Sequence, residues 1–443
     1  MQSANKMMIP KLKLTCLLLA ALPLFCFSQE NSPYSRYGVG NLVPAGNIFN
    51  RGMGGIAAGY ADPVTINNIN PASYGSIIYT TLDVGVEYSS RTIKSQNPLG
   101  AYKSNNGIIS YLQLGLPLLN GNAKADKNRT SLGMTFGLKP ISKINYKINA
   151  TTHNGIDSIA TLYEGNGGVN EAFIGMGLKL KNFSIGFNTG YLFGEKDYNS
   201  KIIFIDTVQY YKAEYDTKTR FGGVLFNAGM QYVAKLKKGV LRLGAYGTLQ
   251  REYSATKDYA VQTFQFDATS GAIDKIDSIY EQKAVKGKVT LPSTLGAGFT
   301  IEKEHVLLGA DFETTNWDGY RFFGDKDQVA NSWMGKFGIQ YYPVPTGSSR
   351  YFNNVRYRAG VSFGKDYITA GGNDLPLYAV TIGGTFPLKV RHTFYDYQYS
   401  FLNLSLEYGN RGNSSNNIKE NTFKVGVGFT LSDRNWFVRR KFN

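Results

Sequence analysis

The sequence predicts an all-β protein: a closed transmembrane β-barrel of about 14 antiparallel strands, with an N-terminal hatch in its lumen. Three observations support this prediction. Ten-residue segments of alternating apolar and polar side chains recur along the chain, an export signal precedes them, and tight and long connections alternate between them. About ten residues is the length that a tilted strand needs to cross an outer membrane, with alternate side chains facing lipid and lumen.

The first 28 residues have the features of a secretory signal peptide. Lys6, Lys11 and Lys13 precede an apolar stretch over residues 14–27. That stretch has the length of a signal-peptide core and is too short for a spanning helix. We expect cleavage after Ser28. A lipoprotein signal is the weaker alternative, because the bulky Phe25 precedes Cys26 where a small residue would be expected.

Loss of the signal peptide changes the composition. Three lysines leave with it, so 48 − 3 = 45 basic residues face 32 acidic ones, a net charge near +13. Such an excess suggests nucleic acid in a cytosolic protein, but export excludes that partner. Lipopolysaccharide phosphates, acidic outer-membrane lipids or an outer-membrane protein are the expected partners. Cys16 and Cys26 also leave, so a thiol-based metal site or nucleophile is not expected.

Fourteen segments have the alternation of a membrane strand. They are 80–90, 107–117, 130–146, 170–181, 183–194, 221–235, 240–253, 288–301, 305–316, 331–342, 355–364, 378–388, 397–409 and 421–431, within a barrel predicted over 77–432. In the last of them Phe423 and Phe429 share one face, and Lys424 and Thr430 share the other. A charge facing lipid near the midplane would cost roughly 2–4 kcal/mol, so the charged and glycine faces should point inward.

The connections between these segments form a pattern of their own. The chain turns within a few residues at 181–182, 237–239 and 302–304, after the fourth, sixth and eighth strands. Long polar segments follow the fifth, seventh and ninth strands, the longest being 255–287. Short periplasmic turns and long extracellular loops alternate in this way in outer-membrane barrels. An even strand count would place the C-terminus in the periplasm.

Residues 29–76 do not follow the strand repeat. A stretch of this length ahead of a barrel can fold into the lumen as a hatch or remain a periplasmic tail. It carries two distinctive patches, which are Arg51, Gly52, Met53, Gly54 and Gly55, and then Asn70, Pro71 and Ala72.

With these patches in this order, the chain resembles the FadL family of outer-membrane transporters for long-chain fatty acids and other hydrophobic compounds. The Leu-Pro-Ser-Thr sequence at 291–294 is also similar to that family. The resemblance implies that the two patches form a hatch and a ligand path, with passive uptake of hydrophobic molecules past it. Non-transporting relatives of the PorV type imply an alternative, a structural subunit of a larger outer-membrane assembly or secretion complex, and the fold alone does not decide between them.

Pro140 is the residue that most suggests a mechanism. It lies in the third predicted strand, and proline cannot donate a hydrogen bond to a neighbouring strand. A missing rung weakens or bulges the wall of a barrel. In the FadL family a kink in the third strand opens a lateral path to the bilayer, so the resemblance implies a lateral gate at Pro140. The alternative is that the strand ends near Lys139.

The last residues, 433–443, continue beyond the final strand. Basic and aromatic side chains there are candidates for a membrane or partner anchor: Arg434, Trp436, Phe437, Arg439, Arg440, Lys441 and Phe442. The alternative is an assembly signal with a solvated tail.

Catalysis and cofactor binding are not expected. Gly52, Gly54 and Ala57 fit a loose dinucleotide pattern, but no alternation of strands and helices surrounds them. His153 and His392 lie in separate predicted connections, and His305 begins the ninth predicted strand. A hydrolase needs a nucleophile, a base and an orienting group together. The sequence therefore predicts a protein that is not an enzyme and holds no metal or cofactor.

Overall fold

The computed structural model describes residues 32–97, 99–119, 130–154, 157–205, 210–267, 269–344, 350–370, 372–388, 398–413 and 415–433. The predicted signal peptide and the seven predicted anchor residues from Arg434 to Phe442 lie outside the described residues. Among the residues that are described, no helix is long and apolar enough to cross a membrane.

Short helices and long strands make up the described chain. The helices are η2 (Pro33–Arg36), α2 (Ile48–Arg51), η3 (Pro71–Ser76), η4 (Trp317–Gly319) and η5 (Tyr351–Asn354). The strands are β1 (Asn41–Leu42), β2 (Thr80–Gln96), β3 (Leu99–Leu119), β4 (Thr130–Asn154), β5 (Asp157–Leu180), β6 (Phe183–Phe204), β7 (Lys212–Leu236), β8 (Gly239–Thr248), β9 (Arg251–Phe266), β10 (Ile273–Leu291), β11 (Thr294–Lys303), β12 (Val306–Thr315), β13 (Arg321–Phe322), β14 (Ser332–Tyr341), β15 (Arg356–Ala370), β16 (Asn373–Pro387), β17 (Gln398–Arg411) and β18 (Ile418–Asp433).

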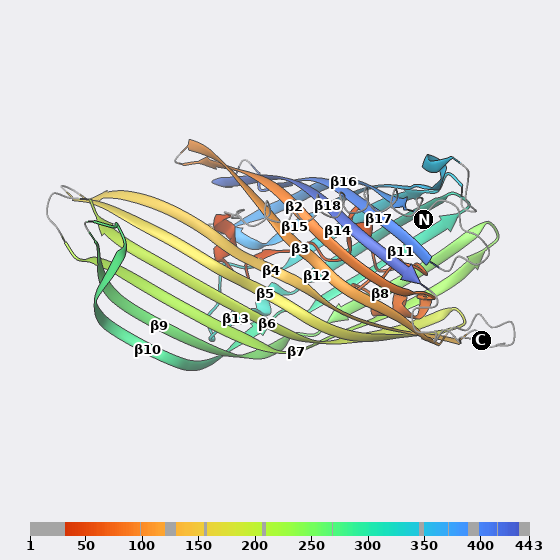
Figure 1. Ribbon diagram of the computed structural model, residues 1–443, viewed down its shortest axis with the longest axis horizontal. Helices are drawn as coiled ribbons and strands as arrows, with labels where there is room; N and C mark the ends of the chain where they lie inside the picture. The colour runs from red at the N-terminus through yellow and green to blue at the C-terminus, as the bar shows by residue number, and fades with distance from the viewer. Residues whose placement is uncertain are drawn as a thin grey trace, which may run out of the picture.

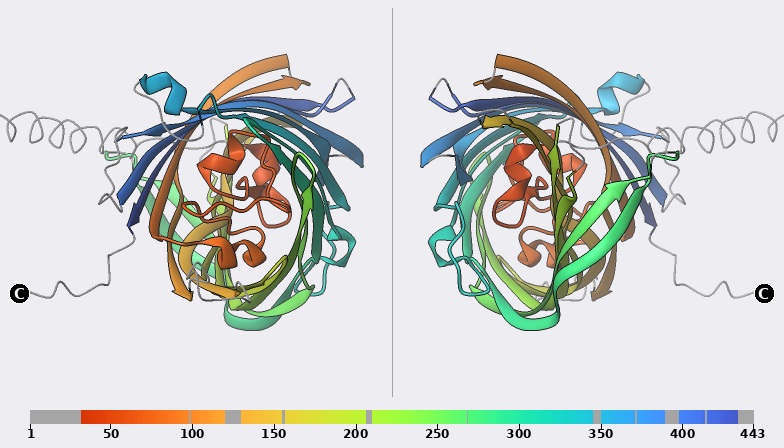
Figure 2. Two further views of the ribbon diagram at one scale, coloured as in Figure 1. Left: turned by 90° about the vertical axis from the view of Figure 1, so that its right-hand side faces the viewer. Right: turned by 90° about the vertical axis from the view of Figure 1, so that its left-hand side faces the viewer.

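The strands from β2 to β18 close into one antiparallel barrel, because β18 pairs with β2 along its whole length. Three pairs of short strands each form one interrupted barrel strand: β8 with β9, β10 with β11, and β12 with β13. The described chain therefore has fourteen barrel strands, and the predicted fold class is confirmed. Figure 2 shows the hatch, drawn in red and orange, inside the ring of strands.

The prediction of inward and outward faces is also confirmed. On β18, Phe423 and Phe429 are about 40% exposed on the outside, whereas Thr430 is fully buried. Lys424 points inward and pairs with Glu407 at 2.7 Å. The outer side chains form the apolar surface that lipid covers, and the inner ones meet the hatch.

The predicted tight turns are confirmed by strand register. Leu180 pairs with Phe183, Leu236 with Gly239, and Lys303 with Val306. These turns lie together at the right-hand end of Figure 1.

The prediction of a long loop over residues 255–287 is wrong. Residues 255–287 belong largely to β9 and β10, which pair as a hairpin through three register shifts. The long polar segment predicted after the fifth strand, between 194 and 221, is also partly wrong, since β6 continues to Phe204 and β7 already begins at Lys212. Ladder hydrogen bonds continue far beyond the membrane-length segments, so β4, β5, β6, β7, β9 and β10 extend past the other strands. We call this extension, at the left of Figure 1, the tall wall.

Candidate functional site

The hatch, residues 32–79, is tied to the wall by a buried ion pair. Arg51 ends the short helix α2 and its guanidinium lies 2.6 Å from the Glu87 carboxylate of β2. Both side chains are at most 7% exposed. The same guanidinium donates to Ser110 Oγ of β3 at 3.3 Å and to the Gly46 carbonyl at 3.2 Å. Arg51 therefore joins two wall strands to the turn that precedes its own helix.

Two further polar side chains, Asp311 and Asn70, form hydrogen bonds with backbone groups across the contact between hatch and wall. The Asp311 carboxylate of β12 accepts hydrogen bonds from the amides of Ala57 and Ala58, at 2.6 and 2.8 Å. Asn70 donates to the Met230 carbonyl of β7 at 3.2 Å and to the Ala58 carbonyl of the hatch, and it accepts from the Ala72 amide. Asn70 is thereby the N-cap of η3, whose first residue is Pro71, a position where proline is favoured.

A row of glycines on the wall lies under the Asn-Pro-Ala patch. Gly133, Gly177, Gly186 and Gly229 are in direct register across β4, β5, β6 and β7. A Cβ atom at Gly177 would lie 2.6 Å from the Pro71 carbonyl oxygen, and one at Gly186 would collide with the Pro71 carbonyl group. The absence of side chains in this row lets the backbone of η3 lie directly on the backbone of the wall.

A second glycine row lies under the first hatch patch. Gly309, Gly338 and Gly360 are in register across β12, β14 and β15. A Cβ atom at Gly338 or Gly360 would collide with the backbone of Met53 or Gly54. Gly54 and Gly55 have φ of +71° and +80°, a conformation that side chains disfavour. The glycines predicted in the hatch therefore pack against glycines of the wall, Gly338 and Gly360, which were not predicted.

The wall is interrupted between the second and third barrel strands. The β3–β4 ladder ends where Leu112 pairs with Leu138, although both strands continue beyond these residues. Pro140 lies just past this point, and the register of β4 against β5 shifts between Pro140 and Ser142. The alternative that the strand ends near Lys139 is wrong, but the predicted bulge is present.

The N-terminal segment of the hatch takes the place of β3 at this interruption. We call residues 32–43 the strap. The Ser32 amide donates to the Asn145 carbonyl at 3.2 Å and the Val43 amide to the Ile141 carbonyl at 2.9 Å. Between them β1 pairs with Lys143 and Ser142 of β4. The strap thus covers the edge of β4 that β3 leaves free.

Polar contacts fix the strap across the lumen. The Tyr34 hydroxyl donates to the Ile418 carbonyl at 2.6 Å, and the Gly38 carbonyl accepts from Lys196 Nζ at 2.7 Å and from the Tyr320 hydroxyl at 3.1 Å. Burial raises the pKa of the Tyr34 phenol above its ordinary value, so this group stays protonated and able to donate. Tyr34 and Val39 also pack in the apolar cluster that contains Trp317.

A cavity of about 540 Å³ lies between hatch and wall. Its side nearest the interruption is largely apolar and is lined by Leu42, Val43, Pro44, Pro140, Ile141, Val169, Leu192 and Leu225. Strands β12 to β18 line another part of the cavity with ion pairs, including Lys336 of β14 with Glu313 of β12 at 3.0 Å and Lys424 of β18 with Glu407 of β17 at 2.7 Å. The cavity is therefore amphipathic rather than uniformly apolar.

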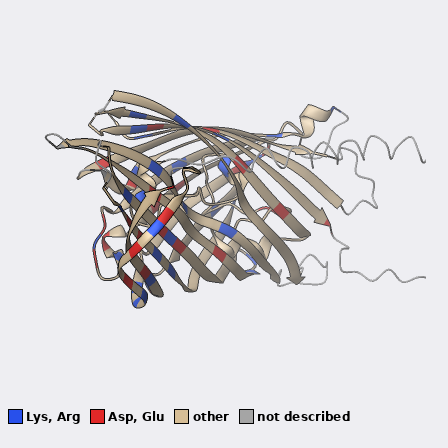
Figure 3. Ribbon diagram, turned by 60° about the vertical axis from the view of Figure 1, so that its left-hand side comes forward, with Lys and Arg blue, Asp and Glu red and all other residues tan. Residues whose placement is uncertain are grey.

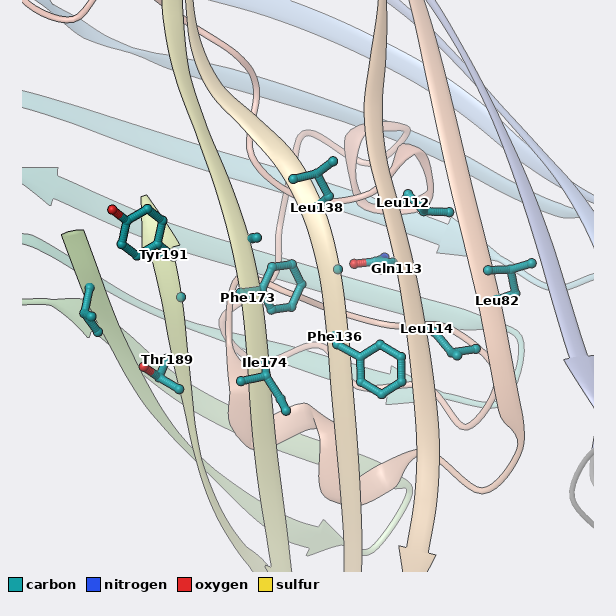
Figure 4. A pocket seen from close by; sticks show the side chains of 14 residues that line it. Leu82, Leu112, Gln113, Leu114, Phe136, Leu138, Phe173, Ile174, Thr189 and Tyr191 are labelled. Carbon is teal, nitrogen blue, oxygen red and sulfur yellow. The ribbon is translucent and has the colours of Figure 1, made fainter. Parts of the chain in front are cut away.

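An apolar groove of about 780 Å³ lies on the outside of the same part of the wall (Figure 4). Leu112, Leu138 and Ile174 face outward along it and are more than 40% exposed. The groove also reaches the inward side chains of Gln113 and Phe173, since Gly137 has no side chain to separate them. On β4 the groove is lined by Phe136, Gly137 and Leu138, and the inner cavity by the next residues, Lys139, Pro140 and Ile141.

The structure thus brings the predicted hatch residues and Pro140 around one cavity. Arg51, Gly54, Gly55 and Pro140 line it, whereas Asn70, Pro71 and Ala72 lie against the first glycine row. The strap, Asp311 and both glycine rows were not predicted. Only the spacing of glycines within each strand could have indicated the rows.

The described part of the chain shows no cluster of metal-ligating side chains beside this cavity. Within those residues, no group of three or more His, Cys, Asp or Glu side chains could hold a metal ion. His153, predicted in a connection, is near the end of β4 and is exposed, with Nδ1 2.8 Å from Ser158 Oγ.

Substitution of Gly186 by alanine should loosen the hatch. The added methyl group collides with the Pro71 carbonyl, and such overpacking costs about 1–3 kcal/mol. We expect faster tryptic cleavage within the hatch of the folded barrel. Gly409→Ala is the matched control, because the nearest atom to its Cβ lies 3.6 Å away. Equal cleavage of both variants would contradict the packing of η3 on the first glycine row.

Substitution of Arg51 by leucine should destabilise the protein by about 3–5 kcal/mol, because it leaves the Glu87 carboxylate buried and unpaired. The double variant Arg51→Leu/Glu87→Leu should recover most of this loss. Urea unfolding of the refolded barrel measures both. A double variant as unstable as the single one would show that the ion pair is not the dominant contact of Arg51.

Three comparisons place the chain among known proteins. No curated protein sequence matches it. Solved barrels with similar folds include the Pseudomonas putida toluene transporter TodX, at 15% identity and TM-score 0.52, covering 89% of this chain and 99% of that one. A FadL homologue from Pseudomonas aeruginosa has 12% identity and TM-score 0.53, covering 88% and 98%. The Ralstonia pickettii toluene transporter TbuX has 12% identity and TM-score 0.51, covering 88% and 99%.

These neighbours confirm the resemblance to FadL-type barrels at the level of the fold. Their identities are too low to transfer a substrate. A protein-family model described as BamG matches residues 8–443, nearly the whole sequence. The chain therefore belongs to the BamG family and has the fold of FadL-type outer-membrane barrels.

Proposed function

We propose that this chain is an outer-membrane channel for hydrophobic small molecules, such as long-chain fatty acids. In this proposal the cargo passes the strap, occupies the cavity beside the hatch, and leaves sideways where β3 and β4 separate. The supporting observation is the juxtaposition at β4: the cavity inside and the apolar groove outside meet at residues 137–140.

The two sides of the cavity favour an amphipathic cargo. The apolar side, next to the interruption, suits a hydrocarbon chain because it removes apolar area from water. The ion pairs of β12 to β18 suit a polar head group, which loses little free energy on leaving water when it finds hydrogen-bond partners in the cavity. Lys139, paired with Glu171 at 3.4 Å, adds a charged group near the interruption.

The proposal includes an orientation in the membrane. Short turns are typical of the periplasmic end of outer-membrane barrels, so the turns at Lys181, Lys238 and Glu304 would face the periplasm. The tall wall would then stand on the extracellular side, and β18 would end near the periplasm. The chemistry of the channel needs no cofactor, and the transporters that share this fold favour the prediction that the chain is not an enzyme.

Substitution of Pro140 by valine tests the exit. Valine restores a backbone donor at the end of the β3–β4 ladder, and one net hydrogen bond of about 1 kcal/mol would slow passage about fivefold. Proteoliposomes that contain lipopolysaccharide and take up a fluorescent long-chain fatty acid provide the measurement. Pro376→Val, in a strand that does not line the interruption, is the matched control. Unchanged uptake by the Pro140 variant would exclude this exit, and absence of uptake by the wild type would exclude the channel.

A second candidate function is a structural subunit of a larger outer-membrane complex. The observation that favours it is the attachment of hatch and strap to many wall strands, because a hatch that stays in this position would keep the lumen closed to cargo. Purification from native membranes in mild detergent separates the two functions. Proteins that co-purify in fixed stoichiometry would support the subunit, whereas a lone barrel with bound lipid would support the channel.

A further inference from the structure

The outer face of the tall wall indicates where the bilayer ends. On β6 the outward Tyr191 and Phe193 are more than 40% exposed, and the next outward residue is Glu195. From Phe183 to Glu195 the strand runs about 40 Å at about 3.3 Å per residue, which a tilt of about 45° reduces to about 28 Å. This height matches the apolar band of an outer-membrane barrel, about 25 Å. The strands above Glu195 therefore stand outside the hydrocarbon.

Above that level the outer face of the tall wall carries ion pairs. Glu195 pairs with Lys218 at 2.8 Å and with Arg220 at 3.2 Å. Higher up, Lys201 joins Glu164 at 3.2 Å and Glu214 at 3.4 Å. Figure 3 shows the charged residues gathered toward this end of the barrel. Such a surface is suited to water or to lipopolysaccharide head groups, not to lipid chains.

The inner, concave face of the same strands is different. One register row crosses all six strands and consists of Ile148, Tyr163, Ser200, Tyr215, Val261 and Tyr280. The next row toward the membrane consists of Tyr146, Gly165, Tyr198, Thr217, Tyr259 and Gln282. The two rows contain six tyrosines and no charged residue. We call this surface the tyrosine face.

Contacts with the strap show that the tyrosine face looks into the mouth of the barrel. The Tyr198 hydroxyl donates to the Arg36 carbonyl at 2.8 Å, and the Arg36 guanidinium lies 5.7 Å from the centre of the Tyr163 ring. Tyr146 packs against Tyr198 with ring centres 6.1 Å apart. These contacts occupy only the base of the surface, because Tyr215 is 38% and Tyr280 is 47% exposed.

The undescribed stretches that connect the tall strands are too short to cover this surface. They are 155–156, 206–209 and 268, with two, four and one residues. A second copy upright in the same membrane is also excluded, since two barrels side by side meet through their outer faces.

The size and composition of the surface favour a protein over a small molecule. Five inter-strand spacings of about 4.8 Å make it about 24 Å wide. A small-molecule site is an enclosed pocket, and neither the cavity at the hatch nor the outer groove is lined by these tyrosines. The cores of protein interfaces are rich in tyrosine and poor in charge, with polar groups at the rim.

We propose that the tyrosine face is a docking site for a separate protein that enters the barrel mouth from the end opposite the tight turns. The partner presents an uncharged, largely apolar segment to the two rows, above the strap. This docking does not depend on the channel function, because it requires no passage through the hatch.

In-cell photo-crosslinking from the full-length protein tests the proposal. Benzoylphenylalanine replaces Tyr215 or Tyr280 in one pair of variants, and Glu195 or Arg220, two exposed residues on the outer face of the same wall, in the control pair. We expect one protein adduct of discrete mass from the first pair and not from the second. No adduct, equal adducts from both pairs, or a heterogeneous glycan adduct would overturn the proposal.

Affinity measurements complete the test. The partner identified from the crosslinked adduct is purified without the crosslink, and its binding to the purified barrel is measured. Tyr215→Ala/Tyr280→Ala should weaken binding at least about tenfold, as for interface residues of this type, while Lys218→Ala on the outer face leaves it within about twofold. Both tyrosines are exposed, so the variant should fold, and fatty-acid uptake should be unchanged. Wild-type affinity in the double tyrosine variant would overturn the docking site.

Discussion

Contact between bare backbones is the constraint on which the rest of this structure depends. Two glycine rows in the wall, one across β4 to β7 and one across β12 to β15, remove the side chains that would separate hatch and barrel. Packing in protein interiors is dense, so one added methyl group in these rows would displace the hatch. Buried polar groups then fix its position, with Asp311 holding the amides of Ala57 and Ala58 and Arg51 reaching Glu87.

The position of the hatch decides what the wall can do near β3 and β4. Backbone groups in a membrane need hydrogen-bond partners, and a closed barrel ordinarily supplies them from the neighbouring strand. Here β3 leaves β4 after Leu138, and the strap supplies part of the missing ladder from within the lumen. The interruption is therefore stable because the hatch is seated, and it places an amphipathic cavity next to an apolar groove.

Much of this architecture follows from sequence. Alternation along 421–431 and its thirteen counterparts predicted every membrane strand, because lipid on one side and a packed lumen on the other impose a period of two. Pro140 indicated a defect at the correct strand. The tall wall was missed because strands with one charged face and one tyrosine face, as in 195–220, do not show the lipid-facing pattern. The glycine rows were not predicted because the register between strands is a tertiary property. The predicted signal peptide and anchor residues lie before residue 32 and after residue 433, outside the described chain, so both stay predictions.

Amide hydrogen exchange of the intact barrel in lipid tests the seating of the hatch most directly. The account predicts that the amides of Ala57 and Ala58, bonded to the Asp311 carboxylate across the hatch–wall contact, exchange as slowly as amides in the β17–β18 ladder. Exchange at the rate of an unstructured peptide would show that the hatch does not rest on the wall, and would contradict the account.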